Sequence, residues 1–308
     1  MDKTAFVFPG QGSQSVGMLA EMAEAFDVVK ATFAEASAVL GYDLWALVQN
    51  GPEADLNATE RTQPALLTAS VATYRAYLAA GGTAPAMMAG HSLGEYSALV
   101  CAGALDFADA VALVEARGQF MQAAVPAGSG AMAAIIGLDD AAVVAGCTEA
   151  ADGDVVEAVN FNSPGQVVIA GSKAAVDRAC EVLKGKGAKR ALPLAVSVPS
   201  HCALMKPAAE QLAQRLAAIA IKTPQVPVIN NVDVIAAESA EAISDALVRQ
   251  LYSPVRWTET VQALATSGIS NVFECGPGKV LTGLAKRIDK ELSAAALGSS
   301  DDVRNAAQ

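Results

Sequence analysis

Histidine and cysteine are both scarce in this chain. Its 308 residues include two histidines and five cysteines, the latter at positions 101, 147, 180, 202 and 275. An odd number of cysteines, none in the paired spacing of metal ligands, argues against a disulfide framework and against a zinc site. We therefore expect a protein with reduced thiols that works in the cytoplasm.

Positive charge and long apolar runs are also lacking. The chain has 32 acidic and 21 basic residues, a formal net charge of −11, which argues against nucleic acid and anionic membranes as general partners. No apolar run approaches the roughly 20 residues that cross a bilayer. The first residues, Asp2 and Lys3 before a short strand-like segment, do not have the pattern of a signal peptide.

An acidic partner would need a local basic area on this acidic protein. The densest candidates are Lys184, Lys186, Lys189 and Arg190, and Lys279, Lys286 and Arg287. The alternative, that these residues are solvated faces of helices and loops, stays open.

Short apolar segments alternate with alanine-rich helical segments along most of the chain. This alternation predicts an α/β protein with a largely parallel sheet. After the linker 125–130 the expected elements are strand 131–136, helix 139–151, strands 155–160 and 166–170, helix 172–187 and strand 190–196. β-α-β-β-α-β is the order of a ferredoxin-like unit. We predict a discontinuous main domain, 1–125 and 199–308, a ferredoxin-like insertion, 126–198, and a mobile tail after about residue 297.

The segment Gly90-His91-Ser92-Leu93-Gly94 places a serine between a predicted strand, 86–89, and a predicted helix, 95–102. In that context Gly-x-Ser-x-Gly forms a strained turn that lifts the serine hydroxyl clear of the sheet. The glycines permit the close packing that such a turn requires. We therefore interpret Ser92 as a nucleophile. The alternative is an ordinary glycine-rich turn that contains a serine.

A nucleophilic serine needs a neighbouring base, and His201 is the candidate. Histidine titrates near neutral pH and commonly accepts the proton of such a hydroxyl. His91 is adjacent to Ser92, so we expect its side chain to face away from the hydroxyl or toward substrate. His201 lies beside Pro199 and Ser200 in an irregular segment, where functional side chains are common. A structural histidine bonded to the backbone remains the alternative for both.

Two further features fit acyl transfer through a serine. The main-chain N–H of Leu93 follows the nucleophile and can donate to a developing oxyanion, and the glycine-rich segment 8–14 can supply a second amide. Arg117 falls in an apolar helical stretch, 107–122, where a charge is unfavourable unless it reaches solvent or meets an anion. Its planar guanidinium suits an acyl group that ends in a carboxylate. A surface arginine is the alternative.

Six blocks of sequence recur in one enzyme family. They are Phe8–Gln14, Glu60–Ala65, Gly90–Ala98, Asn160–Gln166, Pro199–Cys202 and Gly276–Lys279. On these blocks the chain resembles the malonyl-CoA:acyl carrier protein transacylases of fatty-acid synthesis. The resemblance implies an α/β-hydrolase-like core with a ferredoxin-like insertion. It also implies a cytoplasmic enzyme that acts as a monomer and without a cofactor.

The same resemblance implies a reaction and a role for each site residue. Malonyl-CoA would load a malonyl ester onto Ser92, with His201 as the base, and the phosphopantetheine thiol of holo acyl carrier protein would then take the malonyl group, a ping-pong scheme. The remaining implied roles are main-chain oxyanion donors at Gln11 and Leu93, a malonyl-carboxylate contact at Arg117, and a main-chain carbonyl at Gln250 that orients the histidine.

Two other functions are compatible with the same serine turn. The first is a serine hydrolase, such as a thioesterase, but standard α/β-hydrolases carry a late histidine, whereas about a third of this chain follows His201. The second is a catalytically silent subunit that binds the acyl carrier protein. The presence of both Ser92 and His201 argues against it.

Overall fold

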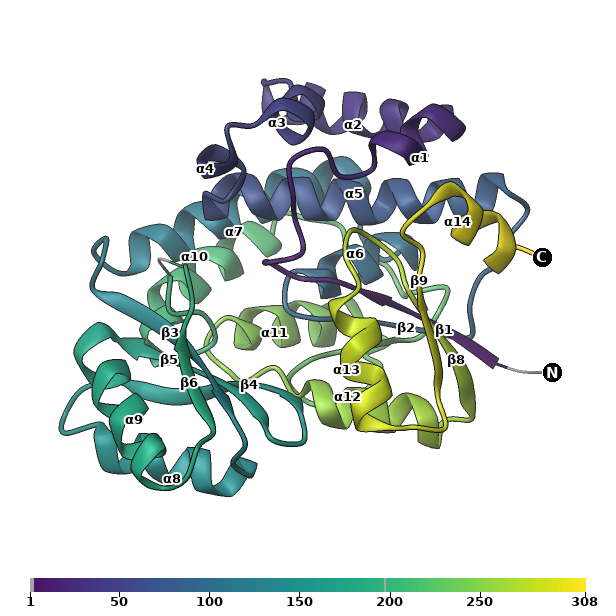
Figure 1. The fold of residues 1–308 in the computed structure, drawn as a ribbon. Coiled ribbons are helices and arrows are strands. Elements are labelled where there is room, and N and C mark those ends of the chain that lie inside the picture. Colours follow the sequence, from purple (N-terminus) through teal and green to yellow (C-terminus); the bar gives the residue numbers. More distant parts are fainter. Residues whose placement is uncertain (1–2, 197) are drawn as a thin grey trace.

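The fold is built on one parallel and one antiparallel sheet in the computed structural model, which describes residues 3–196 and 198–308 (Figure 1). The parallel sheet has the order β7-β2-β1-β8-β9: β1 Lys3–Phe8, β2 Met87–Gly90, β7 Val228–Ile229, β8 Ile269–Glu274 and β9 Ser293–Ala296. The antiparallel sheet has the order β4-β5-β3-β6: β3 Gly130–Ile136, β4 Val156–Ser163, β5 Gln166–Ser172 and β6 Arg190–Pro193. The predicted mixed α/β fold is confirmed. Asp2, used in the signal-peptide argument, lies outside the described residues.

Helices cover both faces of the parallel sheet. On one face lie α5 Thr59–Ala79, α6 Gly94–Cys101, α7 Phe107–Ala124, α10 Lys206–Leu216 and α11 Ala240–Gln250, and on the other α12 Trp257–Thr266 and α13 Val280–Ile288. Successive strand residues point to opposite faces, so Phe6 and Phe8 of β1 join the first core while Ala5 and Val7 join the second. Among the described residues, no helix is both long and apolar enough to span a membrane.

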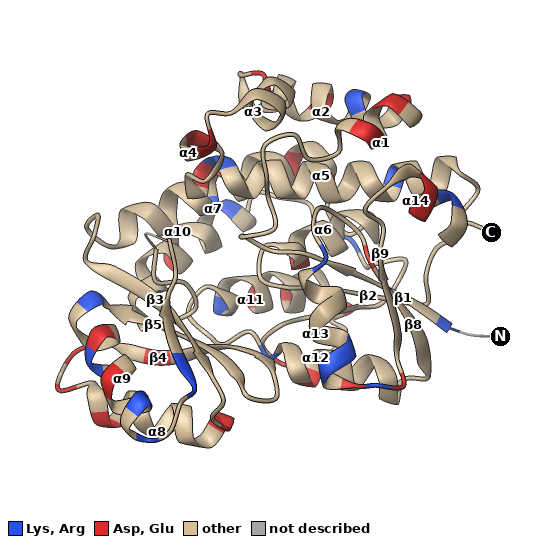
Figure 2. Cartoon of the chain, in the orientation of Figure 1, with Lys and Arg blue, Asp and Glu red and all other residues tan. Residues whose placement is uncertain are grey.

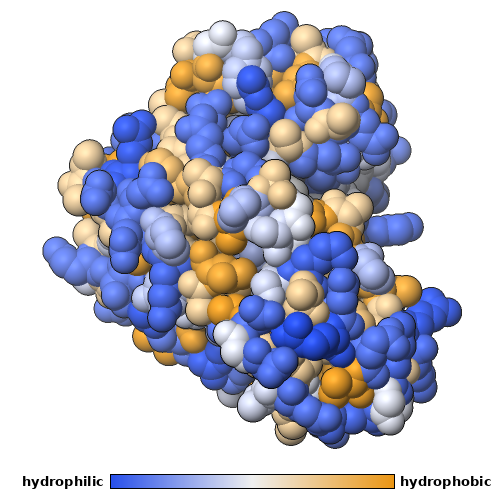
Figure 3. Space-filling view, turned by 90° about the vertical axis from the view of Figure 1, so that its left-hand side faces the viewer, coloured by the Kyte–Doolittle hydropathy of each residue, from blue (hydrophilic) through white to orange (hydrophobic). Residues whose placement is uncertain are grey.

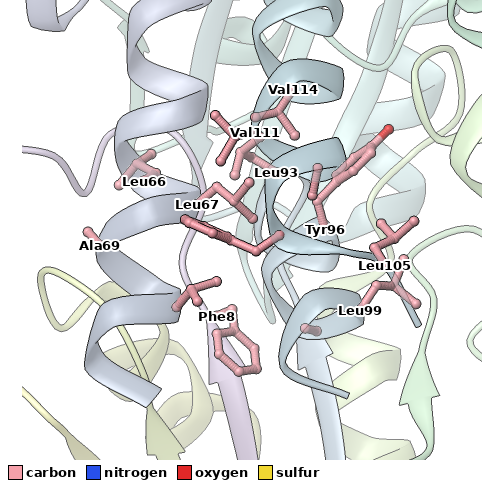
Figure 4. Packing of buried hydrophobic residues seen from close by; sticks show 14 of the residues in the cluster. Phe8, Leu66, Leu67, Ala69, Leu93, Tyr96, Leu99, Leu105, Val111 and Val114 are labelled. Carbon is pink, nitrogen blue, oxygen red and sulfur yellow. The ribbon is translucent and has the colours of Figure 1, made fainter. Parts of the chain in front are cut away.

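Side chains from three helices meet over the end of β1 in the larger core (Figure 4). Leu67 of α5, Tyr96 of α6 and Val111 of α7 are each fully buried there beside Phe8. Burial of one such side chain contributes roughly 1.5–3 kcal/mol. The cluster therefore anchors α6, the helix that follows Ser92, to the sheet.

A layer of short helices lies on the far side of α5 from the sheet (Figure 1). It consists of α1 Ala20–Ala25, α2 Asp27–Leu40, α3 Leu44–Asn50 and α4 Glu53–Leu56. The outer surface of the molecule on the side shown in Figure 3 is mainly polar, with apolar residues in groups between polar ones. Such a distribution is normal for a surface in contact with water.

The antiparallel sheet carries α8 Asp140–Ala150 and α9 Lys173–Gly185 on one face, in the predicted element order. Its opposite face packs toward the rest of the molecule through Met132 and Val168, which belong to one apolar cluster with Cys202. Two main-chain hydrogen bonds of Val255, one to Val159 (2.8 Å) and one from Phe161 (3.0 Å), tie β4 to the segment before α12. The antiparallel sheet is therefore joined to the rest of the molecule by main-chain pairing as well as by apolar contacts.

The last strand of the antiparallel sheet was predicted too long. We expected it to cover 190–196, but β6 ends at Pro193. The apolar residues that suggested a longer strand, Leu194 and Val196, line a cavity instead. The chain then runs through the short helix η1, Ala203–Met205, into α10.

Our expectation of a mobile tail after about residue 297 is wrong. Helix α14, Ser300–Ala306, begins with a capping box in which Ser299 and Asp302 exchange side-chain to main-chain hydrogen bonds. Val303 is fully buried, the Ser300 amide donates to Glu21 (2.9 Å), and Arg304 lies over the ring of Phe26. The spacing of Ser299 and Asp302, three residues apart, is a sequence pattern of a helix start, and it was missed.

Candidate active site

Ser92 lies at a sharp turn between β2 and α6. Its φ is +52°, in the left-handed region that residues other than glycine seldom adopt. A Cβ atom on Gly90 would overlap the main chain of Gly94, and one on Gly94 would overlap the carbonyl group of Phe8. The two glycines of the motif therefore allow the turn to pack directly against the end of β1.

Asn231, just beyond β7, holds this turn from the other side. Its Oδ1 accepts from the Ser92 main-chain N–H (2.8 Å), and its Nδ2 donates to the Gly90 carbonyl (2.7 Å). The side chain is fully buried. A buried hydrogen bond is expensive to leave unmade, so these two bonds stabilise the strained conformation of Ser92.

His201 is in hydrogen-bond contact with Ser92. The two groups come from segments 109 residues apart, and Ser92 Oγ lies 2.7 Å from His201 Nε2. His201 Nδ1 lies 2.6 Å from the main-chain carbonyl oxygen of Gln250. Because a carbonyl oxygen only accepts, Nδ1 carries the proton and Nε2 is free to accept one from the serine hydroxyl.

The imidazole of His201 stays neutral at physiological pH. The side chain is 2% exposed. Burial, followed by the positive charge of Arg117, lowers the pKa of His201 to about 3. Burial disfavours the charged form, so the ring can act as a proton acceptor throughout the neutral range.

Arg117 of α7 is buried. The alternative interpretation, an arginine on the surface, is therefore wrong. Arg117 is 1% exposed and lines one cavity together with Ser92 and His201. Its Nη1 donates to Gln63 Oε1 (2.8 Å) and its Nη2 to Gln250 Oε1 (3.1 Å). The groups that accept from Nη1 and Nη2 are therefore both neutral side-chain amides. Burial lowers the pKa of Arg117, as expected for a cation without a carboxylate partner.

Gln11 and Leu93 line the same cavity as the serine. Leu93 directly follows Ser92, and Gln11 lies in the loop after β1. A groove continues from this cavity. It shares Gln11, His91, Asn160 and Leu194 with the cavity and extends along Val280, Leu281 and Leu284 of α13.

His91 faces away from the serine hydroxyl. Its Nε2 lies 2.8 Å from Oδ1 of Asn162 on β4, and its ring packs at 5.4 Å from the ring of Trp257. Burial lowers its pKa, so the neutral ring donates from Nε2 to the amide oxygen. His91 therefore connects the serine turn to the antiparallel sheet.

Comparison with known proteins identifies the family. Residues 5–300 match the acyl transferase domain family. The chain is 68% identical to malonyl CoA-acyl carrier protein transacylase of Escherichia coli (strain K12) over 297 residues, 96% of each chain. It belongs to the malonyl CoA-acyl carrier protein transacylase family. A second member, from Bacillus subtilis (strain 168), is 47% identical over 311 residues, covering 100% of this chain and 97% of its own.

Solved structures of this transacylase family agree with the fold. A type II PKS acyl-carrier protein in complex with its malonyl-transacylase matches with a TM-score of 0.98 and 63% identity over 99% of each chain. The malonyl CoA-acyl carrier protein transacylase of Coxiella burnetii matches with a TM-score of 0.98 and 54% identity, covering 99% of this chain and 97% of its own. The resemblance stated from the six sequence blocks is thus confirmed.

Three residues of this transacylase site were not predicted from the sequence. Asn231 clamps the serine turn, Gln63 bonds Arg117, and Glu95 bonds the side chain of Gln250. Gln63 and Glu95 lie inside two of the recurring blocks, at 60–65 and 90–98, whereas Asn231 follows the apolar segment 226–229 without any motif. Their roles arise from contacts between distant segments.

Proposed function

We propose that this transacylase moves a malonyl group from malonyl-CoA to the phosphopantetheine thiol of holo acyl carrier protein. The observation that carries the proposal is the cavity shared by the Ser92–His201 pair and a buried arginine with neutral partners. A serine and a neutral histidine suit acyl transfer, and a desolvated guanidinium suits an acyl group with a free carboxylate. The names of the similar proteins from Escherichia coli and Bacillus subtilis support the same reaction.

In the first half-reaction Ser92 Oγ attacks the thioester carbonyl carbon of malonyl-CoA. The hydroxyl proton passes to His201 Nε2, and the Gln250 carbonyl stabilises the imidazolium through Nδ1–H. Main-chain amides of Leu93 and Gln11 donate to the oxyanion of the tetrahedral intermediate. When the intermediate collapses, the carbon–sulfur bond breaks, coenzyme A leaves with the proton from Nε2, and malonyl remains on Ser92 as an ester.

The second half-reaction reverses these steps with a different thiol. His201 accepts the proton of the phosphopantetheine thiol, whose sulfur attacks the ester carbonyl. The carbon–oxygen bond to Ser92 breaks, and the serine recovers its proton from Nε2. Throughout, Arg117 binds the malonyl carboxylate and fixes the acyl group in place. An acetyl group has no carboxylate for this contact.

The groove along α13 suits the phosphopantetheine arm that coenzyme A and holo acyl carrier protein share. It leads away from Ser92 past Leu194 and Val280, two exposed apolar residues. Figure 2 shows basic residues at the end of α13, the helix that lines the groove, and on β6, the strand that ends just before Leu194. They include Arg190 and Arg287, and they would attract the phosphate end of the arm. Of the basic residues suggested from the sequence, Lys184 and Lys186 instead pair with Glu181 and Glu149.

The finer description of the fold is also a proposal. We propose an α/β-hydrolase-like core made of residues 1–125 and 199–308, with a ferredoxin-like insertion at 126–198. The parallel order of the first sheet and the antiparallel order β4-β5-β3-β6 of the second support this division. In this description Ser92 and His201 lie on either side of the insertion in sequence, and the cavity lies where the two parts meet.

Intact-protein mass spectrometry tests the proposed reaction. The enzyme is mixed with malonyl-CoA, and then with holo acyl carrier protein. We expect a malonyl adduct on Ser92 that persists in water and disappears as malonyl-carrier protein forms. An adduct lost equally fast without the carrier protein would favour a hydrolase. No adduct at all would contradict the proposal and return attention to a silent carrier-binding subunit.

A further inference from the structure

Glu95 is a buried carboxylate three residues after the proposed nucleophile. It lies in the first turn of α6 and is 2% exposed. Its Oε2 accepts from the side chain of Gln250 (Nε2, 2.8 Å) and from the main-chain N–H of Asn231 (3.0 Å). The first partner holds the arginine and the histidine, and the second clamps the serine turn. The proposed mechanism uses neither oxygen of Glu95.

The chemistry of its neighbours determines which way the Gln250 amide points. An ionised carboxylate only accepts hydrogen bonds, and a guanidinium only donates them. Gln250 lies between one of each, so its Nε2 must face Glu95 and its Oε1 must face Arg117, as the distances of 2.8 Å and 3.1 Å describe. Glu95 thereby keeps the Gln250 Oε1 atom oriented toward Arg117, whose Nη2 donates to it.

Glu95 also places a negative charge in the hydrogen-bond network of Arg117. A single amide group separates the two buried charges, and their attraction is stronger in a buried site than in water. A malonyl carboxylate that binds Arg117 would have to share this one cation with Glu95. The ionised carboxylate therefore opposes the binding of a second anion.

We infer that Glu95 is a positioning residue that limits how tightly Arg117 holds a malonyl carboxylate, by fixing the Gln250 amide and by balancing the buried positive charge. This inference rests on the proposed function. Its practical effect is release: a malonyl group held too firmly by Arg117 would leave for the carrier protein slowly.

The inference makes malonyl binding sensitive to pH. Burial raises the pKa of Glu95 to about 7, so its charge appears as the pH rises through neutrality. The other charged or titratable groups that act on it are Arg117 of α7, Asp233 after β7 and, on α6, Tyr96. Asp233 is paired with Arg249, which lowers its pKa, and burial raises the pKa of Tyr96 to about 12. Asp233 and Tyr96 therefore keep their charge state near pH 7, and the guanidinium of an arginine stays protonated.

The test compares malonyl-CoA with acetyl-CoA at subsaturating concentration, with acylation of Ser92 followed by mass spectrometry. Glu95→Gln keeps an acceptor oxygen for Gln250 and removes the charge. At about pH 8, where the wild-type carboxylate is ionised, we expect the variant to increase malonylation relative to acetylation by about fivefold or more. At about pH 6 the wild-type group is protonated, and the difference should disappear.

A matched control neutralises a buried carboxylate elsewhere. Glu274 is fully buried and accepts from Leu281 and Thr282, at the start of α13. Glu274→Gln should leave the ratio of malonylation to acetylation unchanged. The wild type gives a second readout that needs no variant, because its own ratio should fall as the pH rises through about 7.

Several results would overturn the inference. An equal change for both acyl groups in Glu95→Gln would mean a purely structural carboxylate, and a selective loss of malonylation would reverse the sign of the charge effect. A wild-type ratio that is flat between about pH 6 and 8 would also refute it. Failure of the wild type to form any malonyl ester on Ser92 would instead refute the proposed function, and this inference with it.

Discussion

Replacement of Arg117 with alanine tests whether this residue selects the malonyl group. In the proposed complex its guanidinium gives two charge-assisted hydrogen bonds to the malonyl carboxylate. Hydrogen bonds to charged groups contribute about 1.5–3 kcal/mol each. Because Arg117 is 1% exposed, water cannot replace them, and we expect a loss of about 3–5 kcal/mol. That loss corresponds to about two to four orders of magnitude in kcat/KM for malonyl-CoA.

Acetyl-CoA provides the comparison, because the acetyl group cannot pair with the arginine. The assay is kcat/KM for both donors with the same holo acyl carrier protein, together with the Tm of each variant. Alanine leaves the acceptors on Gln63 and Gln250 without their donor, so a lower Tm is expected as well. Arg178→Ala is the control, since Arg178 bonds main-chain carbonyls of α8 and its C-terminal end. Equal losses for malonyl and acetyl transfer would refute a selective role.

Four other predictions concern the serine, its base, its clamp and the tail. Ser92→Ala should abolish the malonyl adduct while Ser97→Ala, which changes a buried serine of α6, keeps it; an adduct in the first variant would refute the assignment of Ser92 as nucleophile. The pKa of His201, lowered to about 3, predicts that pre-steady-state acylation does not lose its base between about pH 8 and 5; a fall that follows an ionisation near 6.5 in both wild type and Glu95→Gln would contradict it. Asn231→Ala should lower the free energy of unfolding by about 2 kcal/mol and slow both acyl transfers alike; unchanged urea unfolding would show that the clamp is unimportant. Val303→Ala should lower stability by about 1 kcal/mol or more without changing the malonyl to acetyl ratio; an unchanged Tm would mean that α14 is not docked in solution.

The site residues that could be predicted were those whose residue type is informative. A serine between two glycines, followed along the chain by the second of two histidines, already restricts the chemistry to a few reaction classes. Arg117 was identified as a charge in an apolar helix, but its burial depends on α5 and α11, which supply its two amide partners. Composition alone cannot say whether such a charge meets water or a partner.

The residues that could not be predicted act through distant contacts. Asn231 bonds Ser92 from 139 positions away, and Glu95 accepts from the side chain of Gln250, 155 positions away. Asparagine and glutamate are common on protein surfaces, so neither residue type signals a buried clamp. The two errors in the fold have a related cause. Leu194 and Val196 are apolar because they line a cavity, not because they continue the strand. The tail forms a helix, α14, that packs against α1 and α5.

The two contacts of Gln250 affect any attempt to change the acyl preference of the enzyme. The main chain of Gln250 holds the base and its side chain holds the arginine, so the two parts of the site are not independent units. Replacement of Arg117 by an apolar residue, the obvious route to an enzyme for uncharged acyl groups, would free one side of the Gln250 amide next to His201. Redesign of the pocket should therefore give non-additive double mutants, and a successful variant would need a substitution that satisfies the Gln250 oxygen again.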